Sequence, residues 1–508
     1  MYAKIDSISV QGVEGVPVEV EINLGNGLAS YITVGLPDAA IKESRDRIIS
    51  ALANKNYSVY LDRAVVNLAP ADLKKEGVLY DLPIALGAML AKGDIVIDST
   101  ADFLVVGELS LDGRIRPCKG ILCATITAKK LKKKAVIIPF ENANEAAVVD
   151  DILIYAVKDI DEAISALKGE LKPFDRKENI GSVEVIEENN FLDFEDVKGQ
   201  ELVKRAITIA SAGGHNLLML GPPGSGKSMI AKRIPSILPD MSREEAIETT
   251  KIHSIAGLLD RCESLMCKRP YRAPHHTISN AGLIGGGSHP KPGEVSLSHN
   301  GVLFLDELPE FSRKVLEVLR QPLEDGIVNI TRAACSMTFP ADLMLIAAMN
   351  PCPCGYFGHP TRRCSCSSTM VNRYMSKISG PLLDRIDLHI SVPAVEFKDV
   401  VSTKPALSSR EMKLKVDKAR KLQQIRFEGQ PKQCNAFMNE KMLKIYCKLT
   451  SNASDILELG MQQMGFSARS YSRILKVSRT IADLSESENI ESNHITEALN
   501  YRSFDQRN

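Results

Sequence analysis

Residues 216–228 read NLLMLGPPGSGKS, an apolar stretch that breaks into a glycine-rich loop and ends in Lys227 and Ser228. This is the pattern of a phosphate-binding loop, in the strand, loop and helix context that the motif requires. Glycines let backbone N–H groups turn around an anion without Cβ clashes, and the following helix offers its positive N-terminus. We therefore expect Lys227 to reach the β- and γ-phosphates of a nucleotide and the Ser228 hydroxyl to bind Mg²⁺. The nucleotide-binding residues predicted here are Gly221, Pro222, Pro223, Gly224, Ser225, Gly226, Lys227 and Ser228.

Two further apolar strands are predicted to end in polar residues of the same site. Residues 302–305 of GVLFLDELPEF lead into Asp306 and Glu307, as in a Walker B motif downstream of a complete phosphate loop. We expect Asp306 to hold Mg²⁺ through water and Glu307 to polarise the attacking water. The stretch LMLIAAMN ends in Asn350, whose neutral amide fits the sensor 1 position that orients water or reports the γ-phosphate. The three strand ends therefore predict a site for ATP and Mg²⁺.

The composition is that of an ordinary globular protein. The 508 residues are 44% hydrophobic and 25% charged, which suits about three domains. The formal net charge is zero, so contacts with nucleic acid would have to come from local basic loops. Eleven cysteines, an odd number, argue against a disulfide scaffold and favour reduced thiols or a metal site. No apolar run has the length of a membrane span and MYAKIDSISVQG lacks signal-peptide features, so we expect a cytoplasmic protein without membrane contact.

Changes of pattern along the chain predict four segments. Residues 1–170 alternate strands and helices, and residues 171–192 form a polar linker that contains Pro, Gly and several acids. Residues 193–393 contain the phosphate loop and the strands of an ATPase core. Residues 394–508 show the periodicity of amphipathic helices, which predicts a small helical lid.

The stretch from Val105 to Asn142 resembles the proteolytic domain of Lon proteases and its relative in the RadA recombination ATPase, in the motifs GEL, G-R-I-x-P and VIIP. The resemblance implies an α+β domain of the ribosomal S5 domain 2-like fold. Lon-type proteases need a Ser nucleophile that is activated by a Lys. Where the family carries the serine this chain has Asp81 or a neighbour, and where it carries the lysine this chain has Leu122. We therefore expect a Lon-like domain without peptidase activity.

The segment SGPLLDRIDLHISV, residues 379–392, resembles the arginine-finger region of the AAA+ branch that contains magnesium chelatases and MCM helicases. The resemblance implies a central AAA+ P-loop α/β domain in which Arg385 is offered to the ATP of a neighbouring subunit, and hence a ring. The alternative is a salt bridge within the chain, from Arg385 to Asp384 or Asp387.

The lid contains the motif SAR, which resembles sensor 2 and implies an arginine near the γ-phosphate. Arg469 fits this position better than Arg473, which lies one turn further along the same helix face. The alternative for either residue is an ordinary surface arginine.

Two polar inserts interrupt the ATPase core, at residues 272–301 and 326–343. The first is rich in Gly and His and too polar for a core, and the second has the pattern of a β-hairpin. In the chelatase and MCM branch, two such inserts project toward the central channel of the ring. The resemblance implies that Lys291 and Arg332 grip the DNA backbone, while the alternative is that both are plain loop charges.

Four cysteines are clustered in NPCPCGYFGHPTRRCSC, as two C-x-C pairs separated by nine residues. Thiols packed this closely in a reduced cell suit a tetrahedral structural Zn²⁺ site, in which His359 could replace one thiol. The alternative is four reduced thiols in a loop. The predicted zinc ligands are Cys352, Cys354, Cys364 and Cys366.

Together these motifs resemble the bacterial ComM/YifB family, also labelled magnesium-chelatase-like proteins, over nearly the whole chain. The resemblance is carried by APHHTIS, PKPGE, NGVLFLDELPEF, RQPLEDG, NPCPCG and SARSYSRILKVSRTIADL. It implies a homo-hexameric ring that uses ATP and Mg²⁺ and acts as a DNA helicase, driving branch migration when imported DNA is recombined. Single-stranded or branched DNA and recombination proteins are the implied partners.

The residues themselves predict only a Mg-ATPase that forms a ring. Two other classes therefore stay open. One is the motor subunit of a magnesium chelatase, and the other is an ATP-dependent protein remodeller or protease, although the missing Ser and Lys disfavour proteolysis.

Overall fold

The chain forms two compact units. The first is Met1–Ile186 with Arg243–Met266, and the second is Glu187–Ser242 with Cys267–Asn508. The predicted class, mixed α/β with parallel sheets and a helical C-terminal region, is confirmed. The computed structural model describes residues 1–25, 30–57, 63–75, 77–175, 192–259, 264–287, 290–332, 335–359, 361–394, 406–430 and 432–502, apart from the side chains of Arg332 and Cys335.

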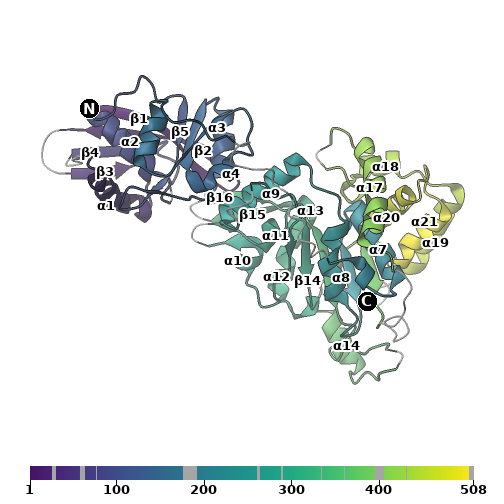
Figure 1. The fold of residues 1–508 in the computed structure, drawn as a ribbon. Helices are drawn as coiled ribbons and strands as arrows, with labels where there is room; N and C mark the ends of the chain where they lie inside the picture. Colours follow the sequence, from purple (N-terminus) through teal and green to yellow (C-terminus); the bar gives the residue numbers. More distant parts are fainter. Residues whose placement is uncertain are drawn as a thin grey trace. The chain divides into compact units, whose positions relative to one another are not determined.

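The first unit is an α+β assembly (Figure 1). Its main elements are β1 (Tyr2–Gln11), β2 (Glu14–Leu24), β3 (Ser30–Val34), α1 (Ala39–Asn54), β4 (Arg63–Ala69), α2 (Asp81–Lys92), β5 (Phe103–Val105), β6 (Glu108–Leu109), β7 (Ile115–Arg116), α3 (Ile121–Lys130), β8 (Ala135–Pro139), α4 (Ala143–Ala146), β9 (Leu153–Val157), α5 (Ile160–Leu167) and α9 (Arg243–Ala256). Within the described residues, one sheet has the order β1-β2-β4-β3 and another β5-β8-β9. In β2, Val18, Val20 and Ile22 are buried and alternate with more exposed residues, as in a strand with one face on a core.

Helix α9 follows the phosphate loop in the sequence but belongs to the first unit. The Ser254 hydroxyl donates to the buried carboxylate of Glu145 and accepts a hydrogen bond of 3.0 Å from the backbone N–H of Gly120. At the other end of α9, Arg243 forms an ion pair with Asp150. A helix that lies between the two nucleotide motifs is thus fastened to the N-terminal unit.

The second unit is organised by a five-stranded parallel sheet in the order β11-β14-β17-β10-β18. Its three central strands are buried along their whole length, which explains why they appear in the sequence as continuous apolar runs. Because all strands run in one direction, their carboxyl ends meet at one edge, where open α/β sheets bind ligands. The strands are β10 (Leu217–Leu220), β11 (Tyr271–Arg272), β14 (Val302–Leu305), β17 (Met344–Met349) and β18 (Leu388–Ser391).

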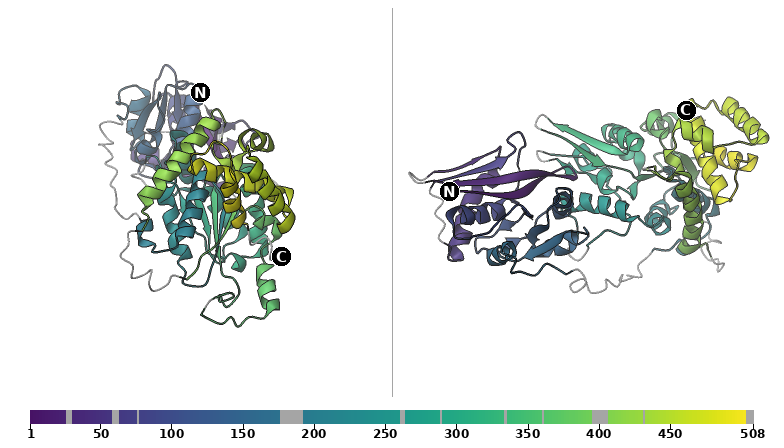
Figure 2. Two further views of the ribbon diagram at one scale, coloured as in Figure 1. Left: turned by 90° about the vertical axis from the view of Figure 1, so that its right-hand side faces the viewer. Right: turned by 90° about the horizontal axis from the view of Figure 1, so that it is seen from above.

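Short helices and two hairpins surround this sheet. One hydrophobic core joins Ile207, Met219 and Ile346 around the sheet to Leu457 and Ile474 of the C-terminal helices, which pack against α7 (Figure 2). The sheet and the C-terminal helices are therefore one folding unit. The surrounding elements are α7 (Glu201–Gly213), α8 (Lys227–Arg233), α10 (Asn280–Ile284), β12 (Gly285–Gly286), β13 (Lys291–Pro292), α11 (Glu294–Leu297), α12 (Arg313–Val318), α13 (Arg320–Asp325), β15 (Ile327–Arg332), β16 (Cys335–Pro340), α14 (Ser368–Met375) and α15 (Gly380–Leu383).

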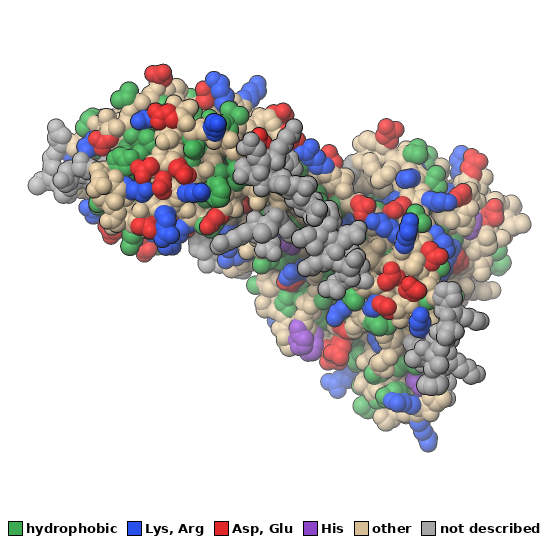
Figure 3. All heavy atoms as spheres, in the orientation of Figure 1, with side chains coloured by type: hydrophobic (Ala, Val, Ile, Leu, Met, Phe, Trp, Pro, Cys, Tyr) green, Lys and Arg blue, Asp and Glu red, His purple; other side chains and the backbone are tan. Residues whose placement is uncertain are grey.

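Charges of both signs are mixed over the visible surface of each unit, in agreement with the zero net charge (Figure 3). Among the described residues, no helix combines the length and the apolar character that a membrane span requires.

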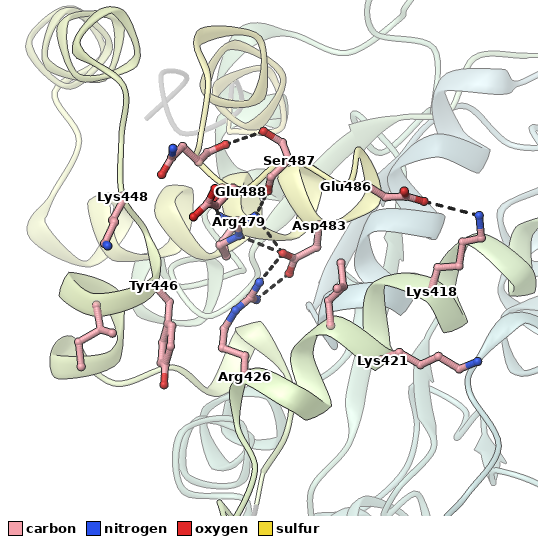
Figure 4. A pocket seen from close by; sticks show the side chains of 13 residues that line it. Lys418, Lys421, Arg426, Tyr446, Lys448, Arg479, Asp483, Glu486, Ser487 and Glu488 are labelled. Atoms are coloured by element: carbon pink, nitrogen blue, oxygen red, sulfur yellow. Dashed lines mark hydrogen bonds and ion pairs between the residues drawn. The ribbon is translucent and has the colours of Figure 1, made fainter.

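The lid is held together by a buried acid. Its helices are α17 (Ser409–Arg426), α18 (Glu440–Tyr446), α19 (Ser451–Met464), α20 (Ala468–Leu484) and α21 (Ser492–Asn500). The wholly buried Asp483 pairs with Arg426 at 2.5 Å and Arg479 at 3.0 Å and accepts a hydrogen bond of 2.8 Å from Asn435. Asp483, Arg426 and Arg479 line a pocket of about 640 Å³, which is also lined by the exposed ion pair of Lys418 with Glu486 (Figure 4).

We predict that Asp483→Ala lowers the stability of the second unit by about 3 kcal/mol, because it leaves two buried guanidinium groups without their counter-charge. The midpoint of thermal unfolding measures the change. The control is Glu486→Ala, which removes an exposed pair that is worth less than about 1 kcal/mol. Equal midpoints for the two variants would contradict this account of the lid.

Candidate functional site

The phosphate loop lies at the carboxyl edge of the parallel sheet. Strand β10 ends at Leu220, and the backbone N–H of Gly221 donates to the carbonyl of Met349, the last residue of β17, at 3.2 Å. Gly224 and Gly226 have φ values of +78° and +85°, a region that glycine enters without strain. The loop thus turns directly from the strand into α8.

The side chain of Lys227 is folded inward onto the loop. It is 7% exposed, and its Nζ donates to the carbonyls of Gly221 at 2.8 Å and Pro222 at 2.9 Å. A weaker contact of 3.3 Å joins Nζ to Oδ1 of Asn350 at the end of β17. Burial lowers the pKa of Lys227 from its usual value, and an ammonium held this way by neutral carbonyls is ready to exchange them for phosphate oxygens.

Ser228 and Asp306 meet across the sheet edge. The Ser228 hydroxyl donates to Oδ2 of Asp306 at 2.5 Å, while Oδ1 of Asp306 accepts the backbone N–H of Glu307 at 2.9 Å. A hydroxyl and a carboxylate are the oxygen donors that Mg²⁺ takes in nucleotide sites. The two residues therefore fit this metal by their chemistry and their proximity.

The side chain of Glu307 makes a different contact from that of Asp306. Its backbone is left-handed, with φ of +51°, and its side chain is 56% exposed. Its Oε2 lies 3.6 Å from Nδ1 of His276, whose ring lies beside that of His275, tilted by 35°, with a centroid distance of 4.0 Å. His276 was missed by the sequence reasoning, although the HisHis pair in the first insert is a visible signal.

Arg385 is held inside its own chain. Its guanidinium pairs with the carboxylate of Glu324 and donates to the carbonyl of Pro381 at 2.6 Å. The acid in this pair is neither of the neighbouring aspartates that sequence spacing suggested. Asp387 instead pairs with Arg473 of the lid.

The two lid arginines lie near Arg385. Arg469 is exposed on α20, and both it and Arg473 help to lower the pKa of Glu324, after the larger effect of Arg385. Arg473 also donates to the backbone carbonyl of Arg385 at 3.2 Å, so the structure brings the arginine-finger candidate together with one sensor 2 candidate, and Arg469 lies one turn before Arg473 on α20.

The two inserts form hairpins. Lys291 is exposed at the start of β13, which pairs with β12. Arg332 ends β15, which pairs with β16, but its side chain lies outside the described residues. The structure therefore gives Lys291 an exposed position and leaves the role of Arg332 as a prediction.

The four cysteines converge. Their Sγ atoms lie within 4.8 Å of one another, and Cys352 is 3.4 Å from Cys354 and 3.7 Å from Cys364. Hydrogen bonds from backbone N–H groups lower the pKa of Cys354 to about 5, which favours its thiolate. His359 instead uses its Nδ1 to accept the backbone N–H groups of its own turn. The thiols, without the histidine, thus form a set that a tetrahedral metal can bind.

The two residues predicted to replace the Ser and Lys of a Lon-type protease have structural surroundings. Asp81 is buried and accepts hydrogen bonds from Arg47, at 2.9 and 3.1 Å, and from the backbone N–H of Leu109. Burial raises the pKa of Asp81 to about 6 against the opposing effect of Arg47. Leu122, at the lysine position, is fully buried. These residues tie α1, α2 and β6 together and offer no serine and lysine pair.

The fold and this site define an AAA+ protein of the magnesium-chelatase type. Residues 193–400 match the family model "Magnesium chelatase, subunit ChlI". Residues 20–142 match "Subunit ChlI of Mg-chelatase", and residues 406–502 match its C-terminal segment.

Full-length relatives identify the branch, and the chain belongs to the ComM/YifB family. It is 43% identical over 511 residues to competence protein ComM of Haemophilus influenzae, covering 99% of this chain and 97% of that protein. It is 39% identical over 498 residues to YifB of Escherichia coli, covering 97% and 96%. The 67 kDa magnesium-chelatase subunit of Chlorobaculum parvum is 26% identical over 164 residues, only 31% of this chain. The predicted family is confirmed.

We predict that Gly221→Ala abolishes nucleotide binding, because a Cβ at this position would collide with the backbone carbonyl of Val392. Gly429→Ala, outside the phosphate loop, is the matched control, since a Cβ there meets nothing within 4 Å and the cost is only the left-handed backbone, about 1 kcal/mol. Titration with a fluorescent ATP analogue measures both variants. Equal affinities would contradict the close approach at Gly221.

Proposed function

We propose that this chain is an ATP-hydrolysing hexameric ring motor that acts on DNA and drives branch migration during homologous recombination of imported DNA. The observation that carries the proposal is the match to a competence protein along 97% of that protein's length. The family to which this chain belongs supports ATPase activity. We assign one residue of the site to each step of ATP hydrolysis below.

In this proposal each strand end contributes one task. Lys227 turns from the loop carbonyls to the β- and γ-phosphates, and Ser228 and Asp306 hold Mg²⁺, which neutralises the charge that develops on the phosphates. Glu307 orients and polarises the attacking water, and Asn350 holds the water or the γ-phosphate in line.

The arginines complete the site from a neighbouring subunit. A guanidinium from the adjoining chain stabilises the charge on the γ-phosphoryl group in the transition state. We assign this task to Arg385, and we assign Arg469 to the sensor 2 role beside it. Such sharing needs a head-to-tail interface between subunits, and a closed ring gives every site a neighbour.

DNA would contact the two hairpins in the channel of the ring. Lys291 of β13 and Arg332 of β15 are the proposed backbone contacts. Because the net charge is zero, this binding depends on a few local cations and should be sensitive to salt.

A second candidate is the motor subunit of a magnesium chelatase, which the descriptions of the matching family models favour. The chelatase 67 kDa subunit matches only 164 residues of this chain. Competence protein ComM, by contrast, matches this chain along nearly its whole length, and we therefore rank the DNA motor first.

The first test is ATP turnover of the purified chain, alone and with single-stranded or Holliday-junction DNA. We expect DNA to raise turnover at least about ten-fold, and Lys227→Ala to reduce turnover to background with and without DNA. The mutant must still bind DNA, because Lys227 is placed to contact phosphates of the nucleotide.

Turnover that ignores every DNA tested would exclude branch migration as the task of this motor. Dependence on a porphyrin would instead support the chelatase alternative, and cleavage or unfolding of a protein substrate would support a remodeller. None of these outcomes contradicts the assignment of the ATP site.

We further propose that Cys352, Cys354, Cys364 and Cys366 bind a structural Zn²⁺. We expect about one zinc ion per chain by elemental analysis, and loss of zinc with a lower unfolding midpoint in Cys354→Ser. Cys267→Ser, an exposed cysteine outside the cluster, is the control and should retain zinc. A metal-free protein with the same stability as the zinc-loaded one would show that the thiols are merely reduced.

A further inference from the structure

Glu324, at the end of α13, faces a group of three arginines. Its carboxylate pairs with the guanidinium of Arg385, whose side chain is 7% exposed, whereas that of Glu324 is 55% exposed. Arg473 donates to the backbone carbonyl of Arg385 at 3.2 Å, and Arg469 lies one turn before Arg473 on α20. The exposed carboxylate of Glu324 is therefore paired with the buried guanidinium of Arg385.

The positive charge of this cluster is only partly compensated. Arg473 is paired with the buried Asp387, and no ion pair to Arg469 is found among the residues that the structure describes. The Nε of Arg385 is also buried and has no hydrogen-bond partner in the described part of the chain. A guanidinium with a spare N–H beside a second cation suits an anion with several acceptor oxygens, such as a phosphate.

We propose that Glu324 is a positioning residue that holds Arg385 until the γ-phosphate of a neighbouring chain's nucleotide takes its place. The inference rests on the ring proposed above, in which Arg385 serves the adjoining site. A γ-phosphate offers more charge and more acceptor oxygens than a single carboxylate, so it displaces Glu324. Until then Arg385 is kept from the reaction and turnover stays low.

The residue that pairs with Arg385 is also close in the chain to the hairpin of β15 and β16. Only Asp325 and Gly326 separate Glu324 from the first residue of β15. Gly326 is left-handed, with φ of +69°, and a Cβ there would collide with the carboxylate of Asp342. Because only two residues intervene, movement of Glu324 shifts the base of the hairpin. DNA on the hairpin and release of Arg385 are thereby coupled.

The test compares Glu324→Gln with Asp325→Asn, which removes the same charge from the next, also exposed residue. We expect Glu324→Gln to raise DNA-free ATP turnover about five-fold, the weight of one partly exposed ion pair. The factor by which DNA stimulates the turnover of this variant should fall by the same amount, because Arg385 is already released from residue 324. Asp325→Asn should match the wild type in both measurements.

Two further variants show whether the effect runs through Arg385. Arg385→Ala should abolish turnover, and adding Glu324→Gln to it should restore nothing. Glu324→Asp, which keeps a shorter carboxylate, should give DNA-free turnover between those of the wild type and Glu324→Gln, and it serves if Glu324→Gln fails to fold. Unchanged or lower DNA-free turnover in a folded variant would overturn the inference.

The failure of this inference differs from the failure of the proposed function. If wild-type turnover ignores DNA, the DNA motor is excluded, while a raised DNA-free rate in Glu324→Gln still supports the holding role. If the wild type responds to DNA but Glu324→Gln behaves as Asp325→Asn does, the holding role is excluded and the motor stands.

Discussion

The parallel register of β10, β14 and β17 is the constraint on which the ATP site depends. Leu220 lies opposite Met349, and Leu305 lies opposite Ala347, so the three strands finish at one edge of the sheet. The contacts between the phosphate loop, the acid after β14 and the amide after β17 exist because of this alignment. The strands contribute only apolar side chains to the core, while the residues that follow them contribute the chemistry.

Buried carboxylates fasten the parts around this sheet. An ionised group is buried only where cations or N–H groups compensate it. Asp483 meets this condition within the lid, Asp387 joins the lid to the end of the sheet, and Glu145 fixes α9 to the first unit. Asp81 accepts hydrogen bonds from Arg47 and so joins two helices of the first unit. A Lon-type protease would instead need a reactive serine near this position. These acids serve packing, unlike Asp306 and Glu307 at the sheet edge, to which we assign roles in ATP hydrolysis.

Much of this organisation could be predicted because its signals are local. The apolar strands, the glycine-rich loop and the acidic pair occupy short stretches, and the predicted fold class and family are confirmed. Long-range pairing could not be predicted in the same way. Sequence spacing suggested Asp384 or Asp387 as an internal partner of Arg385, but its partner is Glu324, which lies 61 residues away. The contact of His276 with Glu307 was also out of reach, since no short pattern links the two stretches.

The sequence by itself determined the phosphate loop, the order of strands and helices, and the family, because backbone conformation and burial follow from neighbouring residues. Only the tertiary structure decided which charges meet. It assigned α9 to the first unit, paired Arg385 with Glu324 and Arg473 with Asp387, and gathered the four thiols. The physical reason is that a charge or a thiol finds its partner through the packing of whole elements, and that packing depends on surfaces far apart in the chain.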